Sequence, residues 1–218
     1  MSQSSAISLT CPKCQHEQEF TLWNSINVAL DPEKKAELKN GSLTRFTCTE
    51  CGNASDVNYP ILYHDPEHRF MVWLSSDDTD PDLAGLPLGE ALHDYRLRLV
   101  KSRNHLVEKS HIFESGLDDL TLELFKVMMR ANPKECPQGE LLFGGLGKDQ
   151  DDSQELEFAI LTDEETKFMG AKKEAYDNYS QMLAQFADSE QLAPGEWHRV
   201  DQNYAVELVR RHLPNAAL

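Results

Sequence analysis

Hydrophobic and polar residues alternate in several short stretches of the chain, and this period of two predicts β-strands. Two of the stretches flank the turn "HDPEH" and are expected to pair as a hairpin. Pro60 lies inside the first of them, so we expect that strand at a sheet edge or at a bulge. The predicted strands cover residues 17–23, 43–48, 57–63, 69–74, 95–102, 139–147, 155–161 and 166–171.

Other stretches repeat their apolar residues at helical spacing. One face of residues 117–132 carries the five apolar side chains Leu117, Leu120, Leu124, Val127 and Met128. Residues 172–190 place Tyr176, Tyr179, Met182, Leu183 and Phe186 together in the same way. Capping residues mark three more helices, beginning at Asp31, Ser102 and Asp201, of which the first ends at Gly41.

The stretch "SSDDTDPDLAGLPLGE" at residues 75–90 is acidic and rich in Pro and Gly, which is typical of a linker. We therefore expect one module over residues 8–75 and a mixed region over 91–218, which either stand apart or share one core. Because helices and strands do not alternate regularly, the pattern predicts an α+β protein and not a parallel sheet.

Composition and charge narrow the class of protein. The chain has 218 residues, 40% of them hydrophobic, and a net charge of −16. It has neither a long apolar run nor a secretory signal, so we expect a soluble cytoplasmic protein without a membrane segment. Nucleic-acid binding depends on basic groups that displace counterions from phosphates, and the charge argues against it.

Four cysteines form two pairs of the same spacing, in "CPKC" and "CTEC". Two such turns together offer four thiolates to one ion, and Zn²⁺ prefers four ligands at tetrahedral corners. The sequence therefore predicts a structural zinc site held by Cys11, Cys14, Cys48 and Cys51. The alternatives are a redox pair and four small buried side chains. With a short helix between the pairs, we expect a zinc-ribbon-like β module.

Together with "DVNYPILYHDPEHRFMVWL", the two pairs resemble the CpXC family of bacteria and archaea over about residues 9–131. The resemblance implies that Cys11, Cys14, Cys48 and Cys51 are the family's four cysteines. Pro12 fits the family's proline, which Thr49 replaces in the second pair. The family has no assigned activity, so the resemblance supports the metal site and implies no reaction.

Other residues are weaker candidates for chemistry. His16 is expected at the surface and not as a ligand. His64 and His68 have the spacing of a helical zinc pair, but Pro66 lies between them and favours a turn. The stretch "FGGLGKDQDD" lacks the first glycine and the final Ser or Thr of a phosphate-binding loop. Cys136 is expected to be an ordinary thiol.

The function predicted from these observations is that of a non-catalytic, zinc-stabilised protein that binds another protein or has a structural role. The sequence does not identify the partner or the oligomeric state. An enzyme whose site is assembled from distant residues, including His64 and His68, is one alternative. A nucleic-acid-binding zinc ribbon is the other, and the charge disfavours it.

Overall fold

The computed structural model describes residues 2–75, 92–131, 136–184, 192–193 and 195–212. The chain forms two compact units, residues 1–107 and 108–218, and the boundary falls inside helix α2 (Arg103–Glu114). Both helices and strands are present, as expected for an α+β protein. The predicted linker lies outside the described residues, apart from Ser75. No helix in the described segments has the length and apolar content needed to cross a bilayer.

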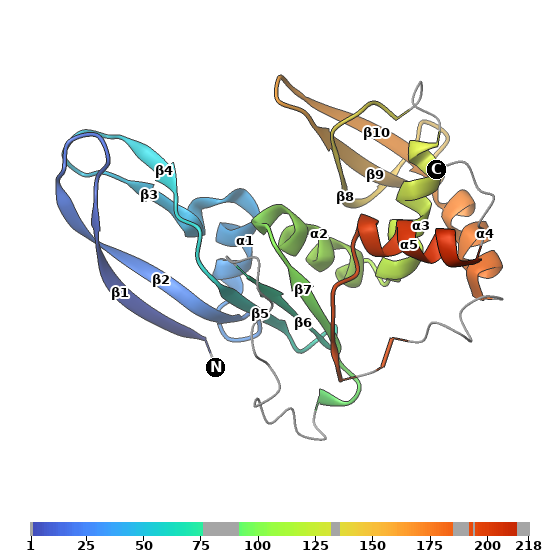
Figure 1. Ribbon diagram of the computed structural model, residues 1–218, viewed down its shortest axis with the longest axis horizontal. Helices are drawn as coiled ribbons and strands as arrows, with labels where there is room; N and C mark the ends of the chain where they lie inside the picture. Colours follow the sequence, from blue (N-terminus) through green and yellow to red (C-terminus); the bar gives the residue numbers. More distant parts are fainter. Residues whose placement is uncertain (1, 76–91, 132–135, 185–191, 194, 213–218) are drawn as a thin grey trace. The chain divides into compact units, whose positions relative to one another are not determined.

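The first unit is built on a mixed sheet with the strand order β1-β2-β5-β6-β7 (Figure 1). The pairs β2–β5 and β6–β7 are parallel, and the pairs β1–β2 and β5–β6 are antiparallel. A separate ribbon is formed by β3 and β4. The elements are β1 (Gln3–Thr10), β2 (Glu17–Asn27), α1 (Pro32–Asn40), the 3-10 turn η1 (Ser42–Thr44), β3 (Arg45–Thr47), β4 (Ala54–Asp56), β5 (Ile61–Asp65), β6 (Phe70–Leu74) and β7 (Arg96–Val100).

The hairpin β5–β6 forms the centre of this sheet and confirms the alternation in the sequence. In both strands every second side chain is buried, and the rings of Tyr63 and Phe70 stack with their centroids 5.8 Å apart. Pro60 precedes β5 and is not inside it, so the strand is shorter than predicted and needs no bulge. The predicted strand 43–48 is also shorter, because η1 occupies its first part.

The second unit packs helices against one face of an antiparallel sheet of order β10-β9-β8. On that face the Phe125 ring lies 6.4 Å from Phe158 and 6.2 Å from Tyr176, so α3 and α4 share a core with β9. The elements are α3 (Asp119–Arg130), β8 (Glu140–Lys148), β9 (Gln154–Leu161), β10 (Thr166–Lys172), α4 (Lys173–Ala184), β11 (Trp197–His198) and α5 (Gln202–His212), together with the end of α2.

The helix starts follow the predicted caps in two of three cases. Ser102 Oγ accepts the His105 amide at 3.1 Å, and Asp201 Oδ1 accepts the Tyr204 amide at 2.9 Å. Asp31 makes no such bond, although α1 does end at Gly41, whose φ is 83°. The predicted apolar face of α3 is wrong at one position, since Met128 is 41% exposed.

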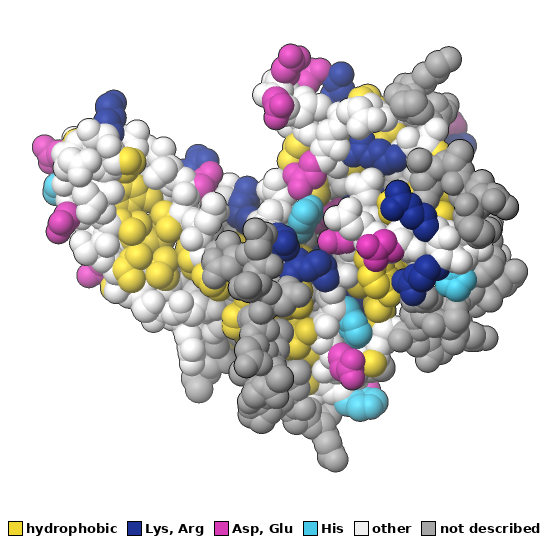
Figure 2. Space-filling view, viewed as in Figure 1, with side chains coloured by type: hydrophobic (Ala, Val, Ile, Leu, Met, Phe, Trp, Pro, Cys, Tyr) yellow, Lys and Arg dark blue, Asp and Glu magenta, His cyan; other side chains and the backbone are white. Residues whose placement is uncertain are grey.

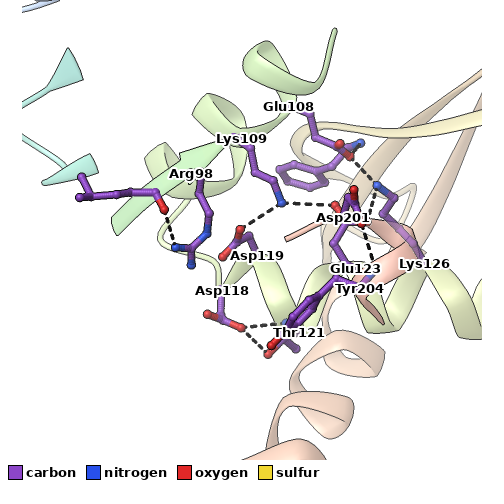
Figure 3. Close-up of polar contacts among 12 residues, drawn as sticks. Arg98, Glu108, Lys109, Asp118, Asp119, Thr121, Glu123, Lys126, Asp201 and Tyr204 are labelled. Carbon is purple, nitrogen blue, oxygen red and sulfur yellow. Dashed lines mark hydrogen bonds and ion pairs between the residues drawn. The ribbon is translucent and has the colours of Figure 1, made fainter. Parts of the chain in front are cut away.

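Buried charges join α2 to α3, and the hydrophobic pattern did not predict them (Figure 3). Lys109 Nζ lies 3.0 Å from Asp119 Oδ2 and 3.4 Å from Glu123 Oε1. Lys126 Nζ lies 3.0 Å from Glu108 Oε1 and 2.9 Å from Glu123 Oε2. All five residues are at most 4% exposed. These contacts define the buried ionic network.

The pKa values in the buried ionic network reflect competition between burial and pairing. Burial raises the pKa of Glu108, and Lys126 opposes this only in part. Burial alone would lower the pKa of Lys109 and of Lys126, but the carboxylates around them outweigh it and raise both values. The lysines therefore stay charged inside the protein, and the Phe143 amide of β8 adds a bond of 2.7 Å to Glu108 Oε1.

Candidate metal centre

The fold brings the two cysteine pairs together, although they are far apart in sequence. The four sulfur atoms all lie within 4.8 Å of one another. Cys11 Sγ is 3.7 Å from Cys51 Sγ, and Cys14 Sγ is 3.5 Å from Cys48 Sγ. Four sulfurs at about 2.3 Å from a central ion would be about 3.8 Å apart. The arrangement is therefore close to the tetrahedron that one metal ion requires, and far from the length of a disulfide.

Two chain reversals of the same geometry position the sulfurs. The Gln15 amide donates to Cys11 O at 2.9 Å, and the Gly52 amide donates to Cys48 O at the same distance. Both residues have positive φ, 61° at Gln15 and 68° at Gly52. A side chain disfavours this conformation and glycine does not, so the backbone is strained at Gln15 and not at Gly52.

The candidate centre lies at one end of the β1–β2 ribbon, beside a small apolar cluster. Cys11 and Cys48 are buried with Phe46, whereas Cys14 is exposed and Cys51 is half-buried. The Phe20 and Phe46 rings lie 6.3 Å apart and join β2 to β3. Figure 2 shows hydrophobic side chains gathered over this part of the first unit. Two buried and two more accessible sulfurs mean that an ion would be held at the surface of the fold.

Gln18 joins the second turn to β2 through two hydrogen bonds, and nothing in the local pattern of residues predicts this role. Its Oε1 accepts the Thr49 amide at 2.8 Å, and its Nε2 donates to Thr47 O at 3.0 Å. A residue inside a strand pattern looks like any other polar position, so only the three-dimensional pairing shows this role. His16 contacts Thr49 Oγ1 at 3.4 Å and does not belong to the group of cysteines that could hold an ion.

The thiols do not favour the same charge state. Hydrogen bonding to the Cys14 amide lowers the pKa of Cys11 to about 6, against the effect of burial. The His16 amide lowers the pKa of Cys14, but burial and the other three thiols outweigh it and raise the value to about 12. Several thiolates so close together repel one another, and a cation among them removes that repulsion.

His64 and His68, which have the spacing of a helical zinc pair in the sequence, contact different partners in the structure. His64 Nε2 is 3.4 Å from Tyr95 Oη and its Nδ1 is 3.4 Å from Asn27 Nδ2. His68 Nδ1 instead bonds to Asp65 Oδ2 at 2.9 Å. Since neighbouring positions of β5 point to opposite faces, His64 and the Asp65–His68 pair lie on different sides of the sheet. These histidines therefore do not share an ion.

The glycine-rich stretch "FGGLGKDQDD" and Cys136 are both accounted for by the fold. The glycines of "FGGLGK" lie in β8, paired with β9, so they do not form a phosphate-binding loop. Cys136 is 1% exposed. Among the described residues, Cys11, Cys14, Cys48 and Cys51 are the group whose donor atoms converge as a metal site requires.

Comparison with known proteins gives one match. Residues 9–126 match the family described as CpXC protein. The chain belongs to the CpXC family. All four clustered cysteines fall within the matched region, which ends inside α3. No curated protein and no solved structure matches this chain. The sheet β8–β9–β10 lies beyond the CpXC match.

Proposed function

We propose that this CpXC protein binds one structural Zn²⁺ through Cys11, Cys14, Cys48 and Cys51, and that it acts as a non-catalytic module that binds another protein. The near-tetrahedral grouping of four sulfurs carries the first part of this proposal. The ion would join β1–β2 to β3–β4, and its binding energy would add to the stability that the small apolar cluster around Phe46 gives to this end of the unit.

Metal analysis tests the site directly. Untagged protein purified without added nickel should contain one equivalent of zinc per chain by inductively coupled plasma mass spectrometry. A sulfur tetrahedron also suits iron, which would give a coloured protein. A colourless protein with one zinc supports the proposal. Iron at one equivalent, or no metal in a folded protein, contradicts it.

The proposal of a protein partner is supported by charge and by the arrangement of the candidate groups. A net charge of −16 does not suit a polyanion. His64 and His68, which the enzyme alternative would use, do not converge. The partner proposal can be tested by crosslinking the full chain in its native cells and purifying it. Partners that are recovered reproducibly with the wild type, and at background level with an unrelated acidic protein, support it. Recovery of none contradicts it.

A further inference from the structure

The outer face of the sheet β8–β9–β10, opposite the helices, carries an apolar row that ends at the sheet edge. Register places Leu142, Ala159 and Phe168 side by side across the three strands. Phe168 is 82% exposed, whereas the next residue, Met169, points to the helix-covered face and is half-buried. A single exposed apolar side chain needs no explanation, but Phe168 continues the row of Leu142 and Ala159, and a contiguous apolar surface is typical of a contact site.

In the described part of the chain, β10 pairs only with β9, so its other edge has unpaired backbone groups. Edge strands are commonly protected from pairing by lysines or prolines. Here Lys167 lies on the opposite face from Phe168 and pairs with Glu165 at 3.0 Å, and Lys172 is the last residue of the strand. The stretch Phe168–Ala171 contains no charge and no proline and is therefore open to a further strand.

A glycine in this stretch lets a negative charge reach the edge. Gly170 is on the same face as Phe168, and a Cβ added there would overlap the carboxylate of Glu155, which belongs to β9. The carboxylate thus lies across the backbone of β10. Lys172 is opposite Glu155 in register, but no ion pair joins them among the described contacts. Glu157 adds a second carboxylate on this face.

We propose that the free edge of β10 binds an extended segment of another protein, which pairs antiparallel with β10 and places an apolar residue beside Phe168 and an Arg or Lys beside Glu155. In antiparallel pairing, the residue opposite Gly170 precedes the residue opposite Phe168 by two positions. The segment therefore reads basic-x-apolar. Main-chain bonds supply affinity, and these two side chains supply specificity. This inference rests on the proposed role in protein binding and assigns the edge of β10 as the binding surface.

A second copy of the chain fits the same edge less well. A symmetric antiparallel pair can place Phe168 opposite Phe168, or Lys172 opposite Gly170. In the first arrangement Gly170 faces Thr166, which cannot neutralise Glu155. In the second arrangement Phe168 would face Glu174, which lies beyond the end of the strand. No register satisfies both Phe168 and Glu155, so charge complementarity favours a basic segment from another chain.

The experiment titrates the full-length, ¹⁵N-labelled protein with a nine-residue threonine peptide that carries arginine at its fourth and leucine at its sixth position. Chemical shifts should change along β10 and at Glu155. Phe168→Ser and Glu155→Gln should each weaken binding about fivefold, the upper range for one cross-strand pair. Lys167→Gln, on the same strand but the opposite face, is the matched control and should not weaken it.

Other outcomes overturn the proposal. These are no shift changes at millimolar peptide, changes elsewhere on the protein, or equal binding of a peptide with glutamate in place of the arginine. Sedimentation of the wild type and of Phe168→Ser measures the oligomeric state of each. A wild-type dimer that Phe168→Ser disrupts would mean that a second copy occupies the edge, and it would also overturn the proposal. Zinc content is measured in every sample. A sample without zinc contradicts the metal proposal, whereas a zinc-loaded sample that does not bind the peptide contradicts the proposal about β10.

Discussion

Gln15 and Gly52 occupy equivalent positions in the two cysteine turns, and only one of them is suited to its conformation. Gln15→Gly should relieve the strain of a side chain at φ 61° and raise the free energy of unfolding by about 0.5–1 kcal/mol. Gly52→Ala should lower it by about 1–2 kcal/mol. No atom lies within 4 Å of a Cβ added at Gly52, so backbone strain alone causes that loss. Urea unfolding of the metal-loaded protein measures both, and equal effects of both substitutions would contradict the assignment.

Cys48 is the buried member of the second pair, and its loss tests the site at the level of one ligand. Cys48→Ser should reduce bound zinc well below one equivalent and destabilise the first unit, because three sulfurs hold the ion less tightly than four. Cys136→Ser is the matched control, since Cys136 is equally buried but distant in sequence from the site. The measurement is zinc content after dialysis against a weak chelator. Retention of a full equivalent by Cys48→Ser would rule out its role as a ligand.

For single residues, the sequence predicted a role where the interacting residues are close together in the chain. The spacing of Cys11, Cys14, Cys48 and Cys51 predicted that their four sulfurs form one cluster. Gln18 was missed because its two partners, Thr47 and Thr49, belong to a distant segment. For His64 and His68, Pro66 correctly indicated a turn, but the spacing did not show that His68 bonds back to Asp65, whose side chain lies on the opposite face of β5 from His64.

Helices α2 and α3 are joined by charges where their hydrophobic pattern predicts only apolar contacts. Lys109→Met removes the cation that Asp119 and Glu123 share and should destabilise the second unit by about 3–5 kcal/mol. Lys173→Met, at the partly exposed pair Lys173–Asp177 within α4, should change stability by less than about 0.5 kcal/mol.

Thermal and urea unfolding of the two lysine variants measure the difference. A loss at Lys109 no larger than that at Lys173 would mean that the buried ionic network adds nothing to the second unit. Because the folded-state pKa of Lys109 is raised, its stabilising charge is present below the unfolded value of 10.5 and is lost as the pH rises through the higher folded value. Its contribution is therefore constant near neutral pH.

The elements that sequence predicted best were those with a strong period or a clear cap. β5–β6 and the helices that follow Ser102 and Asp201 are examples. β1 was not predicted, because "QSSAISLT" has little alternation and gains its strand conformation only by pairing with β2. The burial of the α3 charges was not predicted, since their partners on α2 are not visible in a local window of the sequence.

The whole molecule consists of two compact units, and the candidate metal centre belongs to the first alone. Removal of the ion by a strong chelator should therefore increase hydrogen exchange in β1–β4, while β8 and β9 keep their protection. Exchange measured by mass spectrometry before and after chelation, and after zinc is restored, checks this. Equal loss of protection in β9 would mean that the second unit depends on the ion.

At this scale sequence predicted the fold class but not the connectivity. Regular alternation of strands and helices is absent, which correctly indicated α+β. The parallel pairs β2–β5 and β6–β7 escaped prediction, because they join segments whose order in a sheet has no signature in the chain.

The parallel pairing of β2 with β5 bears on how the first unit folds. Ser25 and Leu62 are partners separated by 37 positions. An ion joining Cys14 to Cys51 would offer a shorter path of two eleven-residue segments. Loop-closure entropy grows only logarithmically, so this shortcut would save about 0.5 kcal/mol. Early metal capture would therefore accelerate assembly of the sheet only about twofold. A much larger effect of zinc on the refolding rate would have to come from native-like structure that the ion induces in the two cysteine turns.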